Sequence, residues 1–197
     1  MLEELVAAIH SQHLVLSPLV DFATWEELTA QMDEARERAT EGFMIKRKAA
    51  HYQAGRRRGD WWKWKVEPLS VDAVMVYAQK GHGKRSGLFT DYTFAVRDGD
   101  AFVPFAKAYS GLTDKEIAQV DRWVKANSLE QFGPVKTVKP ELVFEIGFEG
   151  ISASSRHKSG VAVRFPRILK WRTDKSAAEI DTIETLREML RQYGKMG

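Results

Sequence analysis

The stretch Thr90–Ala108, TDYTFAVRDGDAFVPFAKA, decides the fold that we expect for most of this chain. Two runs rich in aromatic and apolar residues, 90–96 and 101–108, flank Asp98-Gly99, a pair that favours a two-residue hairpin turn. The chain around this hairpin is strongly β in pattern. Three more strands are expected, over 71–78, 141–148 and 161–165.

One helix is expected to interrupt this set of five strands. Thr113 and Glu116 have the spacing of a capping box, in which each side chain bonds the other's backbone N–H. Five short strands with one helix before the fourth is the layout of an OB-fold barrel. The apolar stripe of the helix is formed by Ile117, Val120 and Val124. A last amphipathic helix is expected to end at Gly194, with an apolar side formed by Ile180, Ile183, Leu186 and Leu190.

The first 67 residues are predicted to form a separate unit. A short helix is expected over 2–10, and a second helix should begin at the capping box of Thr24 and Glu27 and end near Thr40. Two strands, 43–46 and 61–66, are joined by an exposed basic loop over 52–59. A proline disfavours the helical conformation of the residue before it, so Glu67-Pro68 marks a boundary. We therefore expect an α+β chain, mainly β, with domains 1–67 and 68–197.

Composition narrows the class of protein. With 44% hydrophobic and 11% aromatic residues among 197, the chain can bury a core. It has no cysteine, which excludes disulfides and thiolate metal sites. No segment approaches the ~18 consecutive apolar residues of a membrane span, and no basic region precedes a long apolar run at the N-terminus. These features favour a globular protein of the cytoplasm.

Positive charge is clustered, although the net charge is only +3. Residues 46–65 carry many Lys and Arg against the single acid Asp60, and a second basic stretch covers 156–172. Clustered cations release counterions when they meet a polyanion, which favours nucleic-acid binding; a solvated basic face is the alternative. The side chains expected to contact a nucleic-acid backbone are Arg56, Arg57, Arg58, Lys84, Arg85, Arg156 and Lys158.

Two short motifs in the first unit combine charge with spacing. Glu41-Gly42 precedes an apolar strand, and its carboxylate suits Mg²⁺, which is held by a few oxygens and substrate phosphates. Lys63 and Lys65 lie two apart in an expected strand, so both ammonium groups face one side, where they could bind a phosphate. Trp62 and Trp64 should then face a core. The structural alternatives are a helix end meeting a strand and a solvated lysine face.

A third motif, Arg172-Thr173-Asp174-Lys175, follows Arg164-Phe165-Pro166-Arg167. A guanidinium fork suits bidentate phosphate binding, and the lysine adds a point charge. The structural alternative is a basic tail that leads into the last helix.

Taken together, these motifs give the chain a family resemblance. The stretches 41–46, 63–65 and 172–175 resemble the fourth, fifth and sixth signature motifs of the nucleotidyltransferases that activate nucleic-acid ends, above all the ATP-dependent DNA ligases. The segments 108–113 and 155–160 are similar to the sequences of bacterial members of this family. The resemblance covers essentially the whole chain, and it implies the end of an adenylation domain followed by an OB-fold domain.

The resemblance implies a three-step reaction with ATP and Mg²⁺ or Mn²⁺ as cofactors. A lysine attacks ATP to form lysyl-AMP, the AMP moves to a 5′-phosphate, and a 3′-hydroxyl displaces AMP to seal a nick. Glu41 would bind the metal, Lys63 and Lys65 the AMP phosphate, and Arg172 and Lys175 the departing pyrophosphate. Asp72 matches the hinge about which the OB domain swings. The cofactor-binding set is completed by Lys46 and Arg167.

One element of the family is absent from these residues. The sequence holds no Lys-x-Asp-Gly, which carries the nucleophilic lysine, so we expect a C-terminal ligase part that does not adenylylate itself. Its expected partners are nicked double-stranded DNA and the missing N-terminal part of the adenylation domain, in a bacterial cytoplasm near the nucleoid. Two alternatives stay open: a non-catalytic OB-fold DNA-binding module, and the equivalent part of an RNA ligase or capping enzyme.

Overall fold

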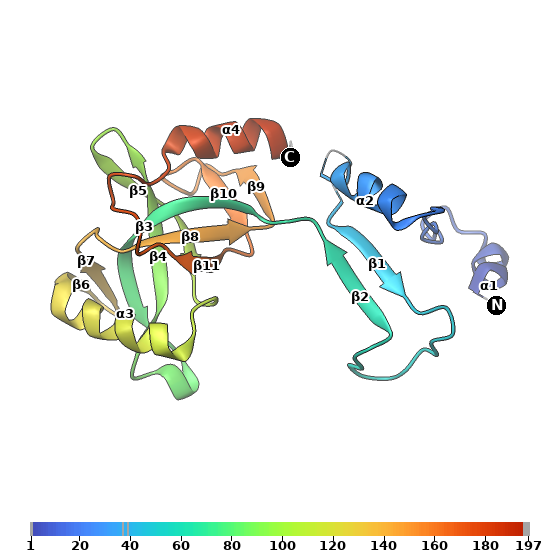
Figure 1. Cartoon of the computed structure of the whole chain (residues 1–197), viewed down its shortest axis with the longest axis horizontal. Coiled ribbons are helices and arrows are strands. Elements are labelled where there is room, and N and C mark those ends of the chain that lie inside the picture. Colours follow the sequence, from blue (N-terminus) through green and yellow to red (C-terminus); the bar gives the residue numbers. More distant parts are fainter. Residues whose placement is uncertain (1, 37, 39, 195–197) are drawn as a thin grey trace. The chain divides into compact units, whose positions relative to one another are not determined.

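The computed structural model describes residues 2–36, 38 and 40–194, and it divides the chain into two compact units, Met1–Val66 and Glu67–Gly197 (Figure 1). In the described residues, no helix combines the length and apolar character needed to cross a membrane. The first unit contains the helices α1 (Leu2–Ile9) and α2 (Trp25–Asp33) and the strands β1 (Gly42–Lys46) and β2 (Trp61–Lys65).

The first unit is built from local signals. Thr24 caps α2 as predicted by accepting a hydrogen bond from the Glu27 N–H at 3.3 Å, but the capping box is incomplete because Glu27 accepts from the Ala23 N–H instead of the Thr24 N–H. The prediction that this helix continues to Thr40 is wrong, because it ends at Asp33. The Ala35 N–H bonds the Met32 carbonyl three residues back, a tightening typical of a helix end. After it, β1 and β2 pair antiparallel.

The second unit is a curled, mainly antiparallel β structure with helices around it (Figure 1). Its central path of strands runs β11-β8-β3-β4-β5, and β7 joins β3 and β6. Strands β9 and β10 pair separately. The elements are β3 (Leu69–Lys80), η1 (Gly83–Arg85), β4 (Phe89–Asp98), β5 (Ala101–Ala108), α3 (Asp114–Asn127), β6 (Ser128–Phe132), β7 (Val135–Val138), β8 (Val143–Phe148), β9 (Gly150–Ala153), β10 (Val161–Arg164), β11 (Arg167–Trp171) and α4 (Ile183–Tyr193).

The curled sheet approaches closure where the chain leaves β5. The Ile168 N–H bonds the Ser110 carbonyl at 2.9 Å, which brings β11 against the end of β5. Gly111 makes this approach possible: its φ is +114°, and a Cβ there would lie 1.8 Å from the Ile168 oxygen. The expected OB-type fold, with α3 between the third and fourth main strands, is thereby confirmed. Its fifth main strand is β11, however, and the expected fifth strand, 161–165, is β10, which is hydrogen-bonded to β9 in a separate pair.

Several details of the β structure differ from expectation. The hairpin turn is Gly99-Asp100 rather than Asp98-Gly99, because Asp98 pairs with Ala101. Of these two turn residues, Gly99 has a positive φ (58°) and Asp100 does not, as a type II′ turn requires. The sequence did not predict four strands of the described chain. Two of them, β6 and β7, form a hairpin on the edge, where exposed side chains such as Phe132 leave no alternating pattern. The other two are β9 and β11.

The core of the second unit lies inside the curled sheet. Phe144 contacts Phe94 at a ring-centroid distance of 5.4 Å and stacks on Trp171 at 5.7 Å. The apolar stripe of α3 is buried, and its predicted capping box forms between Thr113 and Glu116. The last helix buries Ile183 and Leu186, and Gly194 is its C-cap.

Ile180 does not belong to the last helix, contrary to the prediction, because Thr182 caps the helix after it. It packs instead with Val74, Ala95 and Val143. Val74 lies between two residues of the main core in β3, and neighbouring strand residues point to opposite faces. The segment before α4 therefore covers the outer face of the sheet, the face on which Asp72 also lies.

Candidate functional site

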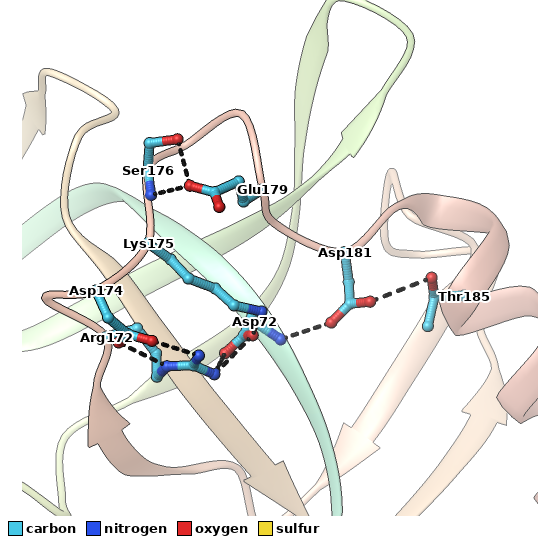
Figure 2. Close-up of polar contacts among 8 residues, drawn as sticks. All are labelled: Asp72, Arg172, Asp174, Lys175, Ser176, Glu179, Asp181 and Thr185. Carbon is cyan, nitrogen blue, oxygen red and sulfur yellow. Dashed lines mark hydrogen bonds and ion pairs between the residues drawn. The ribbon is translucent and has the colours of Figure 1, made fainter.

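An ion-pair cluster on this outer face joins three of the predicted site residues (Figure 2). Arg172 Nη1 donates hydrogen bonds to both oxygens of Asp72, at 3.1 Å to Oδ1 and 2.9 Å to Oδ2. Lys175 Nζ donates to the same Oδ2 at 2.5 Å. Asp72 is only 8% exposed, so these charge-assisted bonds are partly shielded from water. The two predicted pyrophosphate-binding cations therefore converge on one carboxylate.

A second carboxylate, that of Asp174, pairs with the guanidinium of Arg172 from the solvent side. Arg172 donates from Nε to Asp174 Oδ1 at 3.0 Å and from Nη2 to Asp174 Oδ2 at 2.7 Å, a bidentate pair. The hydrogen bonds from Arg172 hold the pKa of the Asp174 carboxyl well below its usual range. In return, Asp174 first and the negative charge of Asp72 next raise the pKa of Arg172 above its usual value.

The backbone fixes Asp72 within this cluster. Its N–H donates to Asp181 Oδ2 at 2.7 Å, and its carbonyl accepts from the Asp181 N–H at 2.9 Å. The carbonyl of Asp181 in turn accepts from the Arg97 N–H. The sequence did not single out Asp181, because it lies 109 residues from Asp72 and only the sheet brings the two together.

The segment that carries Arg172 and Lys175 is a set of tight turns after β11. The Arg172 N–H bonds the Val143 carbonyl of β8 at 2.8 Å, and the Lys175 N–H bonds the Arg172 carbonyl at 3.2 Å. Ser176 then donates from its N–H and its hydroxyl to one oxygen of Glu179, which lowers the pKa of that carboxyl. These turns place the two cations side by side.

The charges of the cluster balance. Asp72 and Asp174 carry two negative charges when ionised, and Arg172 and Lys175 carry two positive ones. In this arrangement the cluster is neutral, although its cations have the fork geometry and spacing that suit phosphate oxygens.

The predicted site residues of the first unit lie around β1 and β2. Lys65 Nζ is 3.7 Å from Glu41 Oε2. Lys63 shares its face of β2 with Lys65 by strand alternation, and Lys46 Nζ lies over the Trp61 ring at 4.6 Å from its centroid. The structure therefore brings Glu41 and Lys65 together, and it places Lys46 against an aromatic ring.

Gly42 is required by the close pairing of these two strands. Its φ is +117°, and a Cβ at this position would lie 2.1 Å from the Trp64 carbonyl oxygen. A side chain here would push β1 away from β2. It would thereby separate Glu41, which precedes β1, from Lys65, which ends β2. The glycine of the first motif thus has a local structural reason.

The prediction that Trp62 faces a core is wrong. Its side chain is 48% exposed, while Trp64 is half-buried between the rings of Phe43 and Trp25. The described part of the first unit buries few apolar residues, namely Leu28, Met32 and Ala35, all in or just after α2. The strand alternation is as expected, but Trp64 alone of the two tryptophans on this face is packed, against Phe43 and Trp25, while Trp62 stays uncovered.

No complete metal site forms among the described residues. They contain no group of three His, Asp or Glu side chains that could hold an ion. Glu41 supplies one carboxylate, which is enough for Mg²⁺ only where substrate phosphates add oxygens.

The predicted DNA-binding side chains are exposed and lie in three separate loops. Arg56, Arg57 and Arg58 lie between β1 and β2, and Arg156 and Lys158 lie between β9 and β10. Lys84 and Arg85 form η1, where Arg85 bonds Asp114 at 3.1 Å. Arg167, a predicted cofactor-binding residue, pairs instead with Glu149 at 3.4 Å.

Comparison with known proteins gives two family matches in chain order. The family described as "ATP dependent DNA ligase domain" matches residues 1–65, and "ATP dependent DNA ligase C terminal region" matches residues 85–175. A probable DNA ligase of Koribacter versatilis is 46% identical over 180 residues, which is 91% of this chain and 31% of that protein. A DNA ligase of Methanoculleus marisnigri is 35% identical over 178 residues, 90% of this chain and 31% of that protein.

Solved structures share the fold at lower identity. The ligase domain of M. tuberculosis LigD has a TM-score of 0.50 and 18% identity, with 90% of this chain and 58% of that chain covered. A structure from a study of Lig E DNA ligases has a TM-score of 0.51 and 21% identity, with 78% of this chain and 48% of that chain covered. The chain spans about a third of the length of the two relatives above.

Proposed function

Because this chain belongs to the ATP-dependent DNA ligase family and corresponds to its C-terminal portion, we propose that it helps a longer ligase to seal nicks in DNA. One observation carries the proposal: both ligase family models match this single chain, in order, over 1–65 and 85–175. The convergence of Arg172 and Lys175 supports it, since two adjacent cations suit a phosphate chain.

The proposed chemistry divides between the two units. When the whole ligase binds ATP, a lysine supplied from outside these residues attacks the α-phosphorus and pyrophosphate leaves. Lys63 and Lys65 bind the phosphate of AMP, where positive charge stabilises the transferring group. Arg172 and Lys175 bind the departing pyrophosphate and hold it in line with the attack.

Glu41 is the proposed metal ligand. Mg²⁺ or Mn²⁺, when bound, neutralises charge on the phosphates. Glu41 would supply one oxygen ligand to it, and the 3.7 Å pair with Lys65 places that carboxylate beside the proposed phosphate-binding lysines. Lys46 and Arg167 complete the proposed nucleotide-binding set.

DNA is the proposed partner of the exposed basic loops. Arg56, Arg57 and Arg58 in the first unit, and Lys84, Arg85, Arg156 and Lys158 in the second, would contact phosphates without reading sequence. Asp72 is the proposed hinge about which the OB-fold unit reorients between the ATP step and the DNA steps. A cytoplasmic, nucleoid-associated location stays a prediction.

Sealing by the complete ligase tests this function. The full protein that contains this chain is expected to seal a nicked DNA duplex with ATP and Mg²⁺. The variants Arg172→Ala and Lys175→Ala should slow the formation of lysyl-AMP by ~100-fold, the scale on which a lost charge contact affects a transition state. An unchanged rate in both variants would contradict the proposed pyrophosphate role.

The 197 residues alone are a second test, because they lack Lys-x-Asp-Gly. Incubated with labelled ATP and Mg²⁺, they are expected to form no covalent AMP adduct. An adduct would overturn the proposal that the nucleophile lies elsewhere. Comparing nicked DNA with nicked RNA as substrates of the full protein separates a DNA ligase from an RNA ligase.

A further inference from the structure

We propose that Asp72 is a built-in competitor for anions, whose carboxylate occupies the two cations that would otherwise bind a phosphate chain. The inference rests on the proposed phosphate-binding role of Arg172 and Lys175. Asp72 Oδ2 accepts a hydrogen bond from each of them, at 2.9 and 2.5 Å. This oxygen takes the place that a phosphate oxygen bridging two cations would take (Figure 2).

The structure identifies which partner is fixed. Asp72 lies within the long strand β3, and its backbone N–H and carbonyl are bonded to the carboxylate and the N–H of Asp181. Arg172 and Lys175 lie instead in the turns that follow β11, and their charged groups are at the ends of long side chains. The cations can therefore turn from a stationary carboxylate to an incoming phosphate by changing rotamers, with no change in the sheet.

Charge balance gives the competition its strength. Asp72 and Asp174 balance the charges of Arg172 and Lys175, and the Asp181 carboxylate adjoins them, so an approaching anion meets no excess positive charge. Asp72 is nearly buried, and its attraction for the two cations is screened less than that of a surface pair. An anion must compete with this internal carboxylate, and only a chain of several phosphates offers enough charge to replace both carboxylates.

The cluster thus holds the domain in a state with low anion affinity. In a free ligase, such a state keeps inorganic phosphate and other small anions from occupying Arg172 and Lys175. A purely structural cluster would behave differently. Removing Asp72 would then lower stability and leave the affinity for anions unchanged.

The test measures binding of tripolyphosphate to the 197-residue chain by calorimetry at low ionic strength. Asp72→Asn is expected to bind it at least ~fivefold more tightly than the unmodified chain, because a nearby opposing charge has gone. Asp100→Asn is the matched control: it changes the net charge equally, in the exposed turn between β4 and β5. It should bind like the unmodified chain. Equal affinities of Asp72→Asn and Asp100→Asn would overturn the proposal.

A second variant guards against misfolding of the first. Asp174 is 57% exposed on its side chain, so Asp174→Asn should keep the fold, which its thermal transition checks. It is expected to tighten tripolyphosphate binding less than Asp72→Asn does, since of the two cations Asp174 bonds Arg172, whereas Asp72 bonds both. If Asp72→Asn does not fold and Asp174→Asn binds no more tightly than Asp100→Asn, the proposal fails.

A triple variant identifies the binding site. Adding Arg172→Gln and Lys175→Gln to Asp72→Asn should abolish the gain in affinity; a gain that persists would place the anion elsewhere and overturn the proposal. Nick sealing by the full protein is a separate measurement. A ligase that seals nicks while its Asp72→Asn chain shows no gain would reject the competitor and keep the proposed function.

Discussion

The two units of the chain differ in how far they bury their large apolar side chains. In the second unit, Phe94, Phe144 and Phe148 are completely buried. In the first unit, Leu19 is 92% exposed and Trp25 is 59% exposed. The second unit has its own hydrophobic core, whereas the first presents apolar surface that its own residues do not cover. Exposed large apolar side chains in such number are expected where another part of a protein normally covers them.

This difference indicates that the second unit supplies most of the stability of the chain. Burial of apolar surface is the main favourable term in folding, so the second unit should unfold as a cooperative domain. The first unit depends on short-range pairing of β1 and β2 and on the caps of α2. We propose that the missing part of the adenylation domain covers its exposed side chains in the complete ligase.

The largest difference between the units is expected when one aromatic ring is removed from each. Phe144→Ala is expected to lower the free energy of unfolding by ~3–5 kcal/mol, because the ring is fully buried between Phe94 and Trp171. Trp62→Ala, with a ring that is 48% exposed, should change it by less than ~0.5 kcal/mol. Denaturant unfolding of the whole chain, followed by far-UV circular dichroism, measures both. Similar losses in the two variants would break the comparison.

A smaller contrast is expected at two glycines with positive φ. Gly111→Ala places a Cβ against the Ile168 carbonyl and should cost ~2–3 kcal/mol of global stability. Gly42→Ala clashes with the Trp64 carbonyl in the same way. It should open only the β1–β2 hairpin and leave the main transition in place.

Amide hydrogen exchange on the whole chain separates the two outcomes for these glycines. Loss of protection confined to β1 and β2 is expected for Gly42→Ala. Gly55→Ala serves as the control, because its φ is +78° but nothing lies within 4 Å of its Cβ. If Gly42→Ala lowers protection in β3 as well, the units are not independent in stability.

The helix caps should give a weaker effect of about 1 kcal/mol. Thr113→Ala removes the capping box of α3 and is expected to destabilise the second unit by ~1 kcal/mol. Thr24→Ala removes the same type of bond from α2 and should fray that helix without moving the main transition. Thermal unfolding by near-UV circular dichroism, which follows the buried aromatic rings, tests the pair.

The same box adds a pH dependence. Hydrogen bonds from Thr113 lower the pKa of Glu116 in the folded chain. The resulting stabilisation is present above the usual carboxyl pKa of ~4.3, and it is lost as the pH falls through the lowered value. Thr113→Ala should therefore lose less stability between neutral and acidic pH than the unmodified chain. An identical pH profile would contradict the role of the box.

The smallest effect concerns DNA. Arg57→Gln in the first unit and Lys158→Gln in the second each remove one proposed phosphate contact. Each should lower the salt slope of DNA binding by ~0.9, with a few-fold weaker affinity. Fluorescence anisotropy of a nicked duplex at several salt concentrations measures the slope. A change in only one variant would assign DNA binding to that unit.

Some features were predictable because they depend on neighbours in the sequence. Ala101–Ala108 is a strand over the expected residues, and both Thr24 and Thr113 cap helices as predicted. Strand β11, which the sequence did not predict, shows where prediction from alternation fails. It contains a register shift between Ile168 and Lys170, so its apolar and polar residues do not alternate cleanly.

The candidate site was predictable as a set of residues but not as an arrangement. Arg172 and Lys175 were recognisable from their spacing, and Asp72 from the hinge position that the family resemblance implies. That they form one cluster follows from neither. Asp174, between the two cations, was overlooked because a carboxylate inside a basic motif resembles a spacer.

The sequence by itself determined the family, the helix caps, the hairpin and the absence of the nucleophilic segment, because each depends on residues close together in the chain. That Asp72 meets a cation 100 residues away, and that Trp62 of β2 lies exposed while Trp64 packs against Phe43, depends on the tertiary structure. The physical reason is register. Burial of alternate side chains aligns β3, β8 and β11, and this alignment places Asp72 beside Arg172 on the outer face.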